Sequence, residues 1–124
     1  ASGRYSAMYK PFHLIGLELN ISILSAALLG QPTGMTKGYH SDVVATAKRP
    51  LKAGEVLDGE GGFTVWGKLC SARQSAEIGG VPIGLAHHLK LTRDVPAGAP
   101  ITWQDVGDHP DTDILALRKK MHVS

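Results

Sequence analysis

The sequence predicts a small, mainly β fold with an internal repeat, an apolar N-terminal helix and a short C-terminal helix. Three observations lead to this prediction. Fifteen glycines and seven prolines are spread through the 124 residues, which is typical of many turns between short elements. Short apolar segments flanked by Gly, Pro or Asp have the length of strands, at 43–47, 63–69 and 85–91. One pattern occurs twice, at 49–57 and at 93–101.

A helix is expected over residues 14–29, ahead of the strands. Its apolar residues recur at steps of three and four, as on one face of a helix: Leu14, Leu17, Ile21, Leu24 and Leu28. Gly30 and Pro32 follow as stop signals. Further apolar residues widen this stripe until little of the helix surface is polar. We therefore expect residues 1–40 to form a helical extension that needs a partner surface, and residues 41–124 to form the β domain.

A shorter helix is expected near the C-terminus. Acidic residues come first, at Asp111 and Asp113, and basic residues come last, at 118–120. The helix dipole favours this order, because it places negative charge at the N-terminal end and positive charge at the C-terminal end. Apolar residues at 114, 115 and 117 lie between the two groups.

The internal repeat aligns residues 49–57 with residues 93–101 at an offset of 44. An arginine, an aliphatic residue, Ala-Gly and a second aliphatic residue coincide in the two copies. The turn residues are Ala53, Gly54, Ala97 and Gly98. A glycine in such a turn can adopt a positive φ that other residues resist. The repeat therefore predicts two sharp turns related by pseudo-twofold symmetry, with the flanking aliphatic residues in a shared core.

A strand followed by aliphatic-x-Ala-Gly-x-x-aliphatic resembles the SAF family. Its members share the β-clip fold and include antifreeze-like domains, sialic acid synthase C-terminal domains, and flagellar and pilus chaperones. Three further segments look like the C-terminal part of homoserine-dehydrogenase-like oxidoreductases that carry a SAF domain, a group related to deoxyxylulose-phosphate-reductoisomerase-like enzymes. They are 9–18 (Tyr-Lys-Pro-Phe-His-Leu-Ile-Gly-Leu-Glu), 65–69 (Val-Trp-Gly-Lys-Leu) and 81–88 (Val-Pro-Ile-Gly-Leu-Ala-His-His). The resemblance covers nearly the whole chain.

The resemblance implies a β-clip in residues 41–124 and a non-catalytic C-terminal module of an NAD(P)-dependent oxidoreductase. The module would contribute to oligomer contacts or close over the active site. Its partner would be the remainder of the parent protein, or a second copy bound through helix 14–29. Two alternatives stay open: a stand-alone domain that binds a sugar acid or another small anion, and an assembly chaperone like the flagellar and pilus members.

Within the chain itself we expect no catalytic, cofactor-binding or metal site. A dinucleotide site needs Gly-x-Gly-x-x-Gly between a strand and a helix, and that spacing does not occur here. NAD(P) is therefore implied for the parent protein and not for this chain. No catalytic triad can be assigned, because triads are recognised by geometry and not by residue inventory.

Four side chains are candidates for binding a small anion. Lys68 and Arg73 form a cationic pair that could hold a carboxylate or phosphate, although solvated surface charges are the plainer interpretation. His87 and His88 are adjacent, and neighbours on a strand point to opposite faces. We therefore do not expect the two histidines to share one metal ion.

The bulk composition excludes several classes of partner. The net charge of +2 comes from 13 Lys and Arg against 11 Asp and Glu, and it is too small and scattered for a nucleic-acid surface. The single cysteine, Cys70, excludes an internal disulfide and fits the reducing cytoplasm in which we expect the protein. The longest apolar stretch, 14–29, is interrupted by polar residues and is too short for a membrane span.

Overall fold

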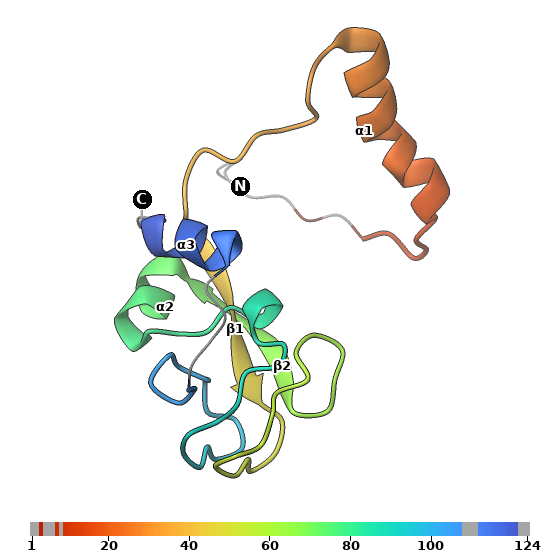
Figure 1. Cartoon of the computed structure of the whole chain (residues 1–124). Coiled ribbons are helices and arrows are strands. Elements are labelled where there is room, and N and C mark those ends of the chain that lie inside the picture. Colours follow the sequence, from red (N-terminus) through yellow and green to blue (C-terminus); the bar gives the residue numbers. More distant parts are fainter. Residues whose placement is uncertain (1–2, 4–6, 8, 108–111, 122–124) are drawn as a thin grey trace. The chain divides into compact units, whose positions relative to one another are not determined.

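The structure is a computed structural model that describes residues 3, 7, 9–107 and 112–121. The chain divides into two compact units, Ala1–Lys37 and Gly38–Ser124. Figure 1 labels the helices and strands in chain order. The elements in chain order are α1 (Ile15–Leu29), β1 (Ser41–Ala47), β2 (Val65–Ser71), α2 (Ala72–Ile78), a 3-10 helix (Ile83–Leu85) that the figure leaves unlabelled, and α3 (Asp113–Lys120).

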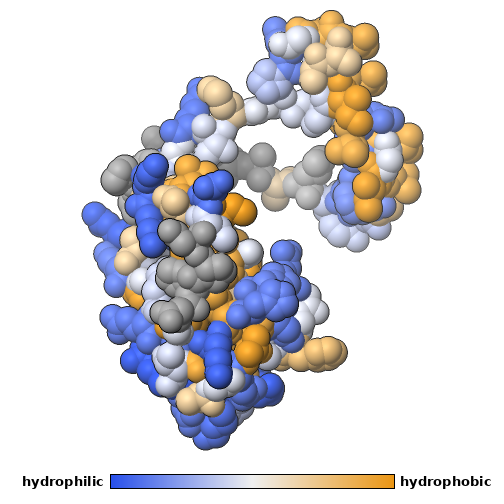
Figure 2. Space-filling view, in the orientation of Figure 1, coloured by the Kyte–Doolittle hydropathy of each residue, from blue (hydrophilic) through white to orange (hydrophobic). Residues whose placement is uncertain are grey.

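The first unit consists of α1 and the segments that flank it. The predicted helix is confirmed to within one residue at its start. The Glu18 carboxylate accepts the Leu14 N–H at 3.2 Å, which satisfies one of the free N–H groups at the helix start. Gly30 ends the helix in the left-handed conformation, with a φ of 61°. No residue of α1 is buried, and Figure 2 shows its hydrophobic surface.

The second unit contains a two-stranded antiparallel sheet in which β1 pairs with β2. The register places Ser41 opposite Ser71 and Ala47 opposite Val65. The strands predicted at 43–47 and 63–69 are therefore confirmed, with boundaries shifted by about two residues. None of the helices in the described ranges has the length and apolar character needed to cross a bilayer.

The strand predicted at 85–91 is wrong. Residues 83–85 form a 3-10 helix after Pro82, and His88 has a φ of 62°, which an extended strand does not allow. Leu89 and Leu91 are buried at the alternating positions that suggested a strand. Only isolated bridges pair this segment, such as the bridge between Leu91 and Val106, so no regular ladder forms.

The helix α2 is not among the elements expected from the sequence, although its boundary signals are present. The Ser71 hydroxyl accepts the Gln74 N–H at 3.1 Å, and Gly79 ends the helix with a φ of 62°. The short helix α3 is confirmed, with Thr112 as its N-cap. The described residues therefore form a small mixed domain of helices and a two-stranded sheet, and the prediction of a mainly β fold is not confirmed.

Both copies of the repeat contribute to one hydrophobic core. Its fully buried larger side chains are Leu51, Leu57, Val65, Val81, Leu91 and Ile101. Leu51 and Val95, which correspond to each other in the two copies, exchange both backbone hydrogen bonds at 2.8 and 2.9 Å. Two further pairs of backbone hydrogen bonds are related by the same offset, and each of these bonds is 2.8 Å long. The Gly54 N–H donates to the Leu91 carbonyl, as the Gly98 N–H donates to that of Ala47. The Leu57 N–H donates to the Leu89 carbonyl, as the Ile101 N–H donates to that of Ala45. The turn glycines, Gly54 and Gly98, have φ values of 89° and 77°.

A tight loop between the first copy of the repeat and β2 is organised by one carboxylate. Asp58 accepts the N–H groups of Phe63 at 2.5 Å and of Thr64 at 3.0 Å, and also the Thr64 hydroxyl. The Thr64 hydroxyl and these N–H groups stabilise the ionised form, and they lower the pKa of Asp58 to about 2. The loop therefore depends on a negative charge at Asp58.

We expect this dependence to appear as acid sensitivity of the fold. Because the pKa of Asp58 is lower in the folded chain, its contribution to stability is complete above the ordinary value of 3.8 and is lost as the pH falls towards about 2. The Asp58→Asn variant should lose less stability between about pH 5 and about pH 3 than the wild type, measured as urea midpoints. The exposed Glu60 in the same loop provides a control, because Glu60→Gln should keep the wild-type profile. An unchanged acid response in Asp58→Asn would contradict the assignment.

Candidate functional site

The two residues of the predicted cationic pair lie on neighbouring elements, β2 and α2. Lys68 lies on β2 and lines a cavity of about 210 Å³ together with Cys70 and Gln74. Arg73 lies in the first turn of α2, and it is not among the residues that line this cavity. Both side chains are exposed, as expected for solvated surface charges. Their role in anion binding stays a prediction.

The two histidines occupy a turn and not a strand. Their ring centroids are 6.0 Å apart, and the ring planes are tilted by 48°. His87 packs over Gly59, where an added Cβ would lie 2.4 Å from the imidazole ring. The His88 N–H donates to the carbonyl of Leu57 at 2.9 Å, which ties the turn to the core. In the described parts of the chain, no group of three or more metal-ligating side chains is arranged around a common point.

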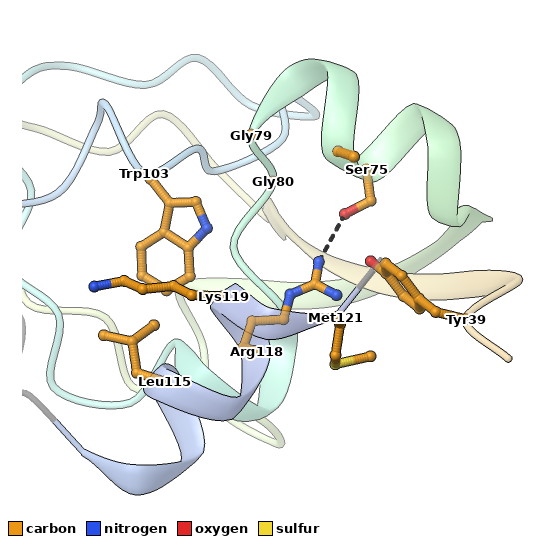
Figure 3. Close-up of a pocket in the computed structure, with 10 residues that line it drawn as sticks. Tyr39, Ser75, Gly79, Gly80, Trp103, Leu115, Arg118, Lys119 and Met121 are labelled. Carbon is orange, nitrogen blue, oxygen red and sulfur yellow. Dashed lines mark hydrogen bonds between the residues drawn. The ribbon is translucent and has the colours of Figure 1, made fainter. Parts of the chain in front are cut away.

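A separate cavity of about 330 Å³ lies where α2, α3 and the segment around Trp103 meet (Figure 3). Ser75 and Ala76 of α2 and the glycines that follow them form one side. Arg118 and Lys119 of α3 lie on the other side. The described residues that line the cavity are Tyr39, Ser75, Ala76, Gly79, Gly80, Trp103, Leu115, Arg118, Lys119 and Met121.

Asp42, at the start of β1, organises the polar wall of this cavity. Its Oδ2 accepts three side-chain donors: the Tyr39 hydroxyl at 2.7 Å, the Ser75 hydroxyl at 2.5 Å and Arg118 Nη2 at 2.6 Å. Its Oδ1 accepts the N–H of Val43 at 2.9 Å. The Arg118 guanidinium also lies over the ring of Tyr39, 4.6 Å from the centroid. One carboxylate therefore connects β1, α2 and α3.

The ion pair in this cluster is largely removed from solvent. The side chains of Arg118 and Asp42 are 16% and 11% exposed. Burial raises the pKa of Asp42, but the hydrogen bonds from Ser75 and Tyr39 and the charge of Arg118 outweigh it, so this pKa lies below its ordinary value. Burial and the neighbouring Asp42 raise the pKa of Tyr39. Asp42 is therefore ionised and Tyr39 is protonated at neutral pH, as the hydrogen bonds require.

The cavity also carries a cation that Asp42 does not neutralise. Lys119 lines the cavity, and it makes no ion pair with any other described residue. Both bonds from Arg118 to Asp42 and Ser75 use the same nitrogen, Nη2. A guanidinium carries five N–H donors, so these bonds do not exhaust it. The cavity thus combines positive charge with the indole of Trp103 and the buried side chain of Leu115.

Sequence reasoning missed every residue of this cluster as a site residue. Asp42 and Arg118 are 76 positions apart, and no motif connects them. The basic residues of α3 suit the helix dipole, so they do not by themselves indicate a binding site. The local signals that exist, a Ser in an Ala-rich helix and an Asp before a strand, are common and carry no specific chemistry. Only the tertiary fold brings the donors of α2 and α3 to one carboxylate of β1.

A comparison with protein families supports the interpretation of the repeat. The model of the SAF domain matches residues 42–107, which is slightly more than half of the chain. The matched range begins at Asp42 and includes both copies of the repeat, β2 and α2. Arg118 and Lys119 lie beyond it. No curated protein matches the chain.

Proposed function

The chain belongs to the SAF domain family, and we propose that it is a non-catalytic accessory module of an NAD(P)-dependent oxidoreductase, attached to its partner through α1. The observation that carries this proposal is the character of α1. Its large exposed apolar side chains are Ile15, Leu17, Leu19, Ile21, Ile23, Leu24, Leu28 and Leu29. A helix that is apolar around most of its circumference is stable when it is packed inside protein, because water contacts on every side are unfavourable.

The carboxylates of the SAF domain support a non-catalytic role. Asp42, Asp58 and Asp105 each accept several hydrogen bonds from their own chain. Burial raises the pKa of Asp105, but the hydrogen bonds from Thr102 and from Arg93 outweigh it and lower this pKa, as is also found for Asp42. A general acid or base needs a pKa near the working pH. These carboxylates are therefore structural acceptors.

We further propose that the two copies of the repeat form a pseudo-twofold β-clip. The reciprocal bonds between Leu51 and Val95 support this arrangement, because a twofold axis makes corresponding residues exchange identical contacts. The bonds of Gly54 and Gly98 add a second equivalent pair of contacts. The repeated segments supply part of the core, and the helices α1, α2 and α3 lie outside the repeated pattern.

The accessory role predicts that the isolated chain associates through α1. Sedimentation velocity should show concentration-dependent oligomers of the wild-type chain. The double variant Leu17→Glu/Leu24→Glu should raise the dissociation constant at least about 100-fold, because two buried leucines contribute about 2 kcal/mol each to an apolar interface. Glutamate has a high helix propensity, so α1 itself should persist.

A matched control uses an exposed leucine of the other unit. Leu69 lies on β2 and is largely exposed, so Leu69→Glu should leave the association unchanged. A wild-type chain that remains a monomer at about 100 μM, or equal effects of the two changes, would refute the role assigned to α1.

The proposed oxidoreductase context can be tested separately, by reading the gene sequence upstream of this chain. Coding sequence upstream of Ala1 for a strand followed by Gly-x-Gly-x-x-Gly would support the proposal, because that pattern forms a dinucleotide site. An upstream signal peptide would instead support the chaperone alternative.

A further inference from the structure

We propose that the cavity between α2 and α3 binds a small organic carboxylate with a flat apolar face. Lys119 holds the carboxylate, Arg118 adds positive charge to the cavity wall, and the indole of Trp103 contacts the flat face. The proposal goes beyond the accessory role and does not depend on it, because the site consists only of residues from the unit Gly38–Ser124. Figure 3 shows the residues that form it.

The dimensions of the cavity suit a small ligand. Its volume of about 330 Å³ lies at the lower end of the range for small-molecule sites in proteins. Trp103 and Leu115 supply apolar surface, and Tyr39, Ser75, Arg118 and Lys119 supply polar groups. A mostly apolar lining with a few convergent polar groups is typical of such sites.

The polar wall is held in place before any ligand binds. The Asp42 carboxylate fixes Tyr39, Ser75 and Arg118 through bonds of 2.5 to 2.7 Å. Side chains that are fixed in this way lose little further freedom on binding, which lowers the entropic cost of association. Arg118 is also stacked on Tyr39, so its guanidinium has a defined plane.

The charge of the wall identifies the class of ligand. Arg118 and Lys119 contribute two positive charges, and Asp42 contributes one negative charge that already accepts three side-chain donors. An anion therefore balances the excess charge of Lys119. Carboxylates accept charge-assisted hydrogen bonds from Lys and Arg, which are stronger than bonds between neutral groups.

The proposed ligand needs an apolar face because the half-buried Trp103 borders the cavity. Trp103 also borders a second cavity of about 190 Å³ that contains His87 and Leu89. In Figure 3 the indole lies at the same end of the cavity as Lys119 and Leu115, whereas Ser75 and Tyr39 lie at the other end. A ring or planar chain placed on the indole would keep its carboxylate within reach of α3.

The test is an NMR titration of the full chain with benzoate, in which the signal of the Trp103 indole N–H is followed. The chain has two tryptophans, and the Trp66→Phe variant assigns the two indole signals. Benzoate should shift the Trp103 signal with a dissociation constant of about 1 mM, as expected for a ligand of about nine heavy atoms. Benzamide has the same shape without the charge, and it should bind at least about tenfold more weakly.

Two neighbouring lysines on α3 provide a matched pair of variants. Lys119→Met removes the charge and retains an apolar stem, and it should raise the dissociation constant for benzoate about tenfold. Lys120→Met removes the same charge one residue further along α3, outside the cavity lining, and should change the constant less than about twofold. Lys68→Ala, on β2, should also have little effect.

Three results would overturn the proposal. The first is that benzoate up to about 20 mM causes no saturable shift of the Trp103 signal. The second is that benzoate and benzamide bind with equal affinity. The third is that the changes at Lys119 and Lys120 have equal effects on binding. The amide spectrum of each variant reports whether α3 stays folded, so loss of structure is distinguished from loss of binding. None of these results depends on α1, so they leave the accessory role untouched.

Discussion

Asp42→Ala is expected to lower the free energy of unfolding by about 3 kcal/mol. Three side-chain donors lose their common acceptor, and the Arg118 charge is left without a partner at a position where its side chain is 16% exposed. Removing one partner of a buried ion pair typically costs about 3 to 5 kcal/mol, and the remaining exposure places this pair at the lower end. The loss should be concentrated in α3, because Arg118 is its link to β1.

Urea denaturation measures the change in unfolding free energy, and hydrogen exchange of the α3 amides reports where the loss occurs. The control is Asp94→Ala. The Asp94 carboxylate binds Lys52 at 2.7 Å and accepts the Ala53 N–H at 2.9 Å, but its side chain is 58% exposed, so we expect a much smaller loss than for Asp42→Ala. A similar small loss for Asp42→Ala would show that the cluster does not hold α3 in place.

Leu57→Ala and Ile101→Ala should each lower the free energy of unfolding by about 3 kcal/mol. Both side chains are fully buried in the common core, and each truncation leaves a cavity as well as removing apolar contacts. The two residues are separated by the 44-residue offset, and their N–H groups make equivalent bonds to Leu89 and Ala45. The proposed pseudo-twofold arrangement therefore predicts that the two costs agree within about 1 kcal/mol.

Urea denaturation again provides the measurement, with Val56→Ala as the control. Val56 adjoins Leu57 and is about half exposed, so its truncation should cost less than about 1 kcal/mol. If one core variant unfolds the chain and the other has almost no effect, the two copies are not equivalent in the core. If both costs are near that of Val56→Ala, the core assignment itself is wrong.

Features with a local cause were predictable from the sequence. The helix 14–29 was found almost to the residue, because its apolar spacing and Gly30 act within the helix itself. The SAF family was found from the repeat, and the family match over residues 42–107 confirms it. The glycines of the turns adopt the positive φ that the pattern required. The oxidoreductase context stays a prediction.

The predictions made from the sequence are wrong where tertiary packing overrides the local sequence pattern. Buried Leu89 and Leu91 alternate as in a strand, but Pro82 and the left-handed His88 turn the backbone away from a ladder. The cap of α2 at Ser71 is visible in the sequence, yet the segment is only seven residues long and has no clear apolar stripe. Short elements of this kind depend on their neighbours more than on propensity.

The sequence by itself determined the apolar helix, the repeated turns and the family, because each depends on residues that are close along the chain or that recur at one fixed offset. Only the tertiary structure decided the position of the candidate site. Arg73 is not among the residues that line the cavity beside Lys68, whereas Asp42, Ser75 and Arg118 meet from three separate elements. The meeting of these three residues depends on how α2 and α3 are placed beside β1 in the folded chain, and no pattern in the local sequence predicts that placement.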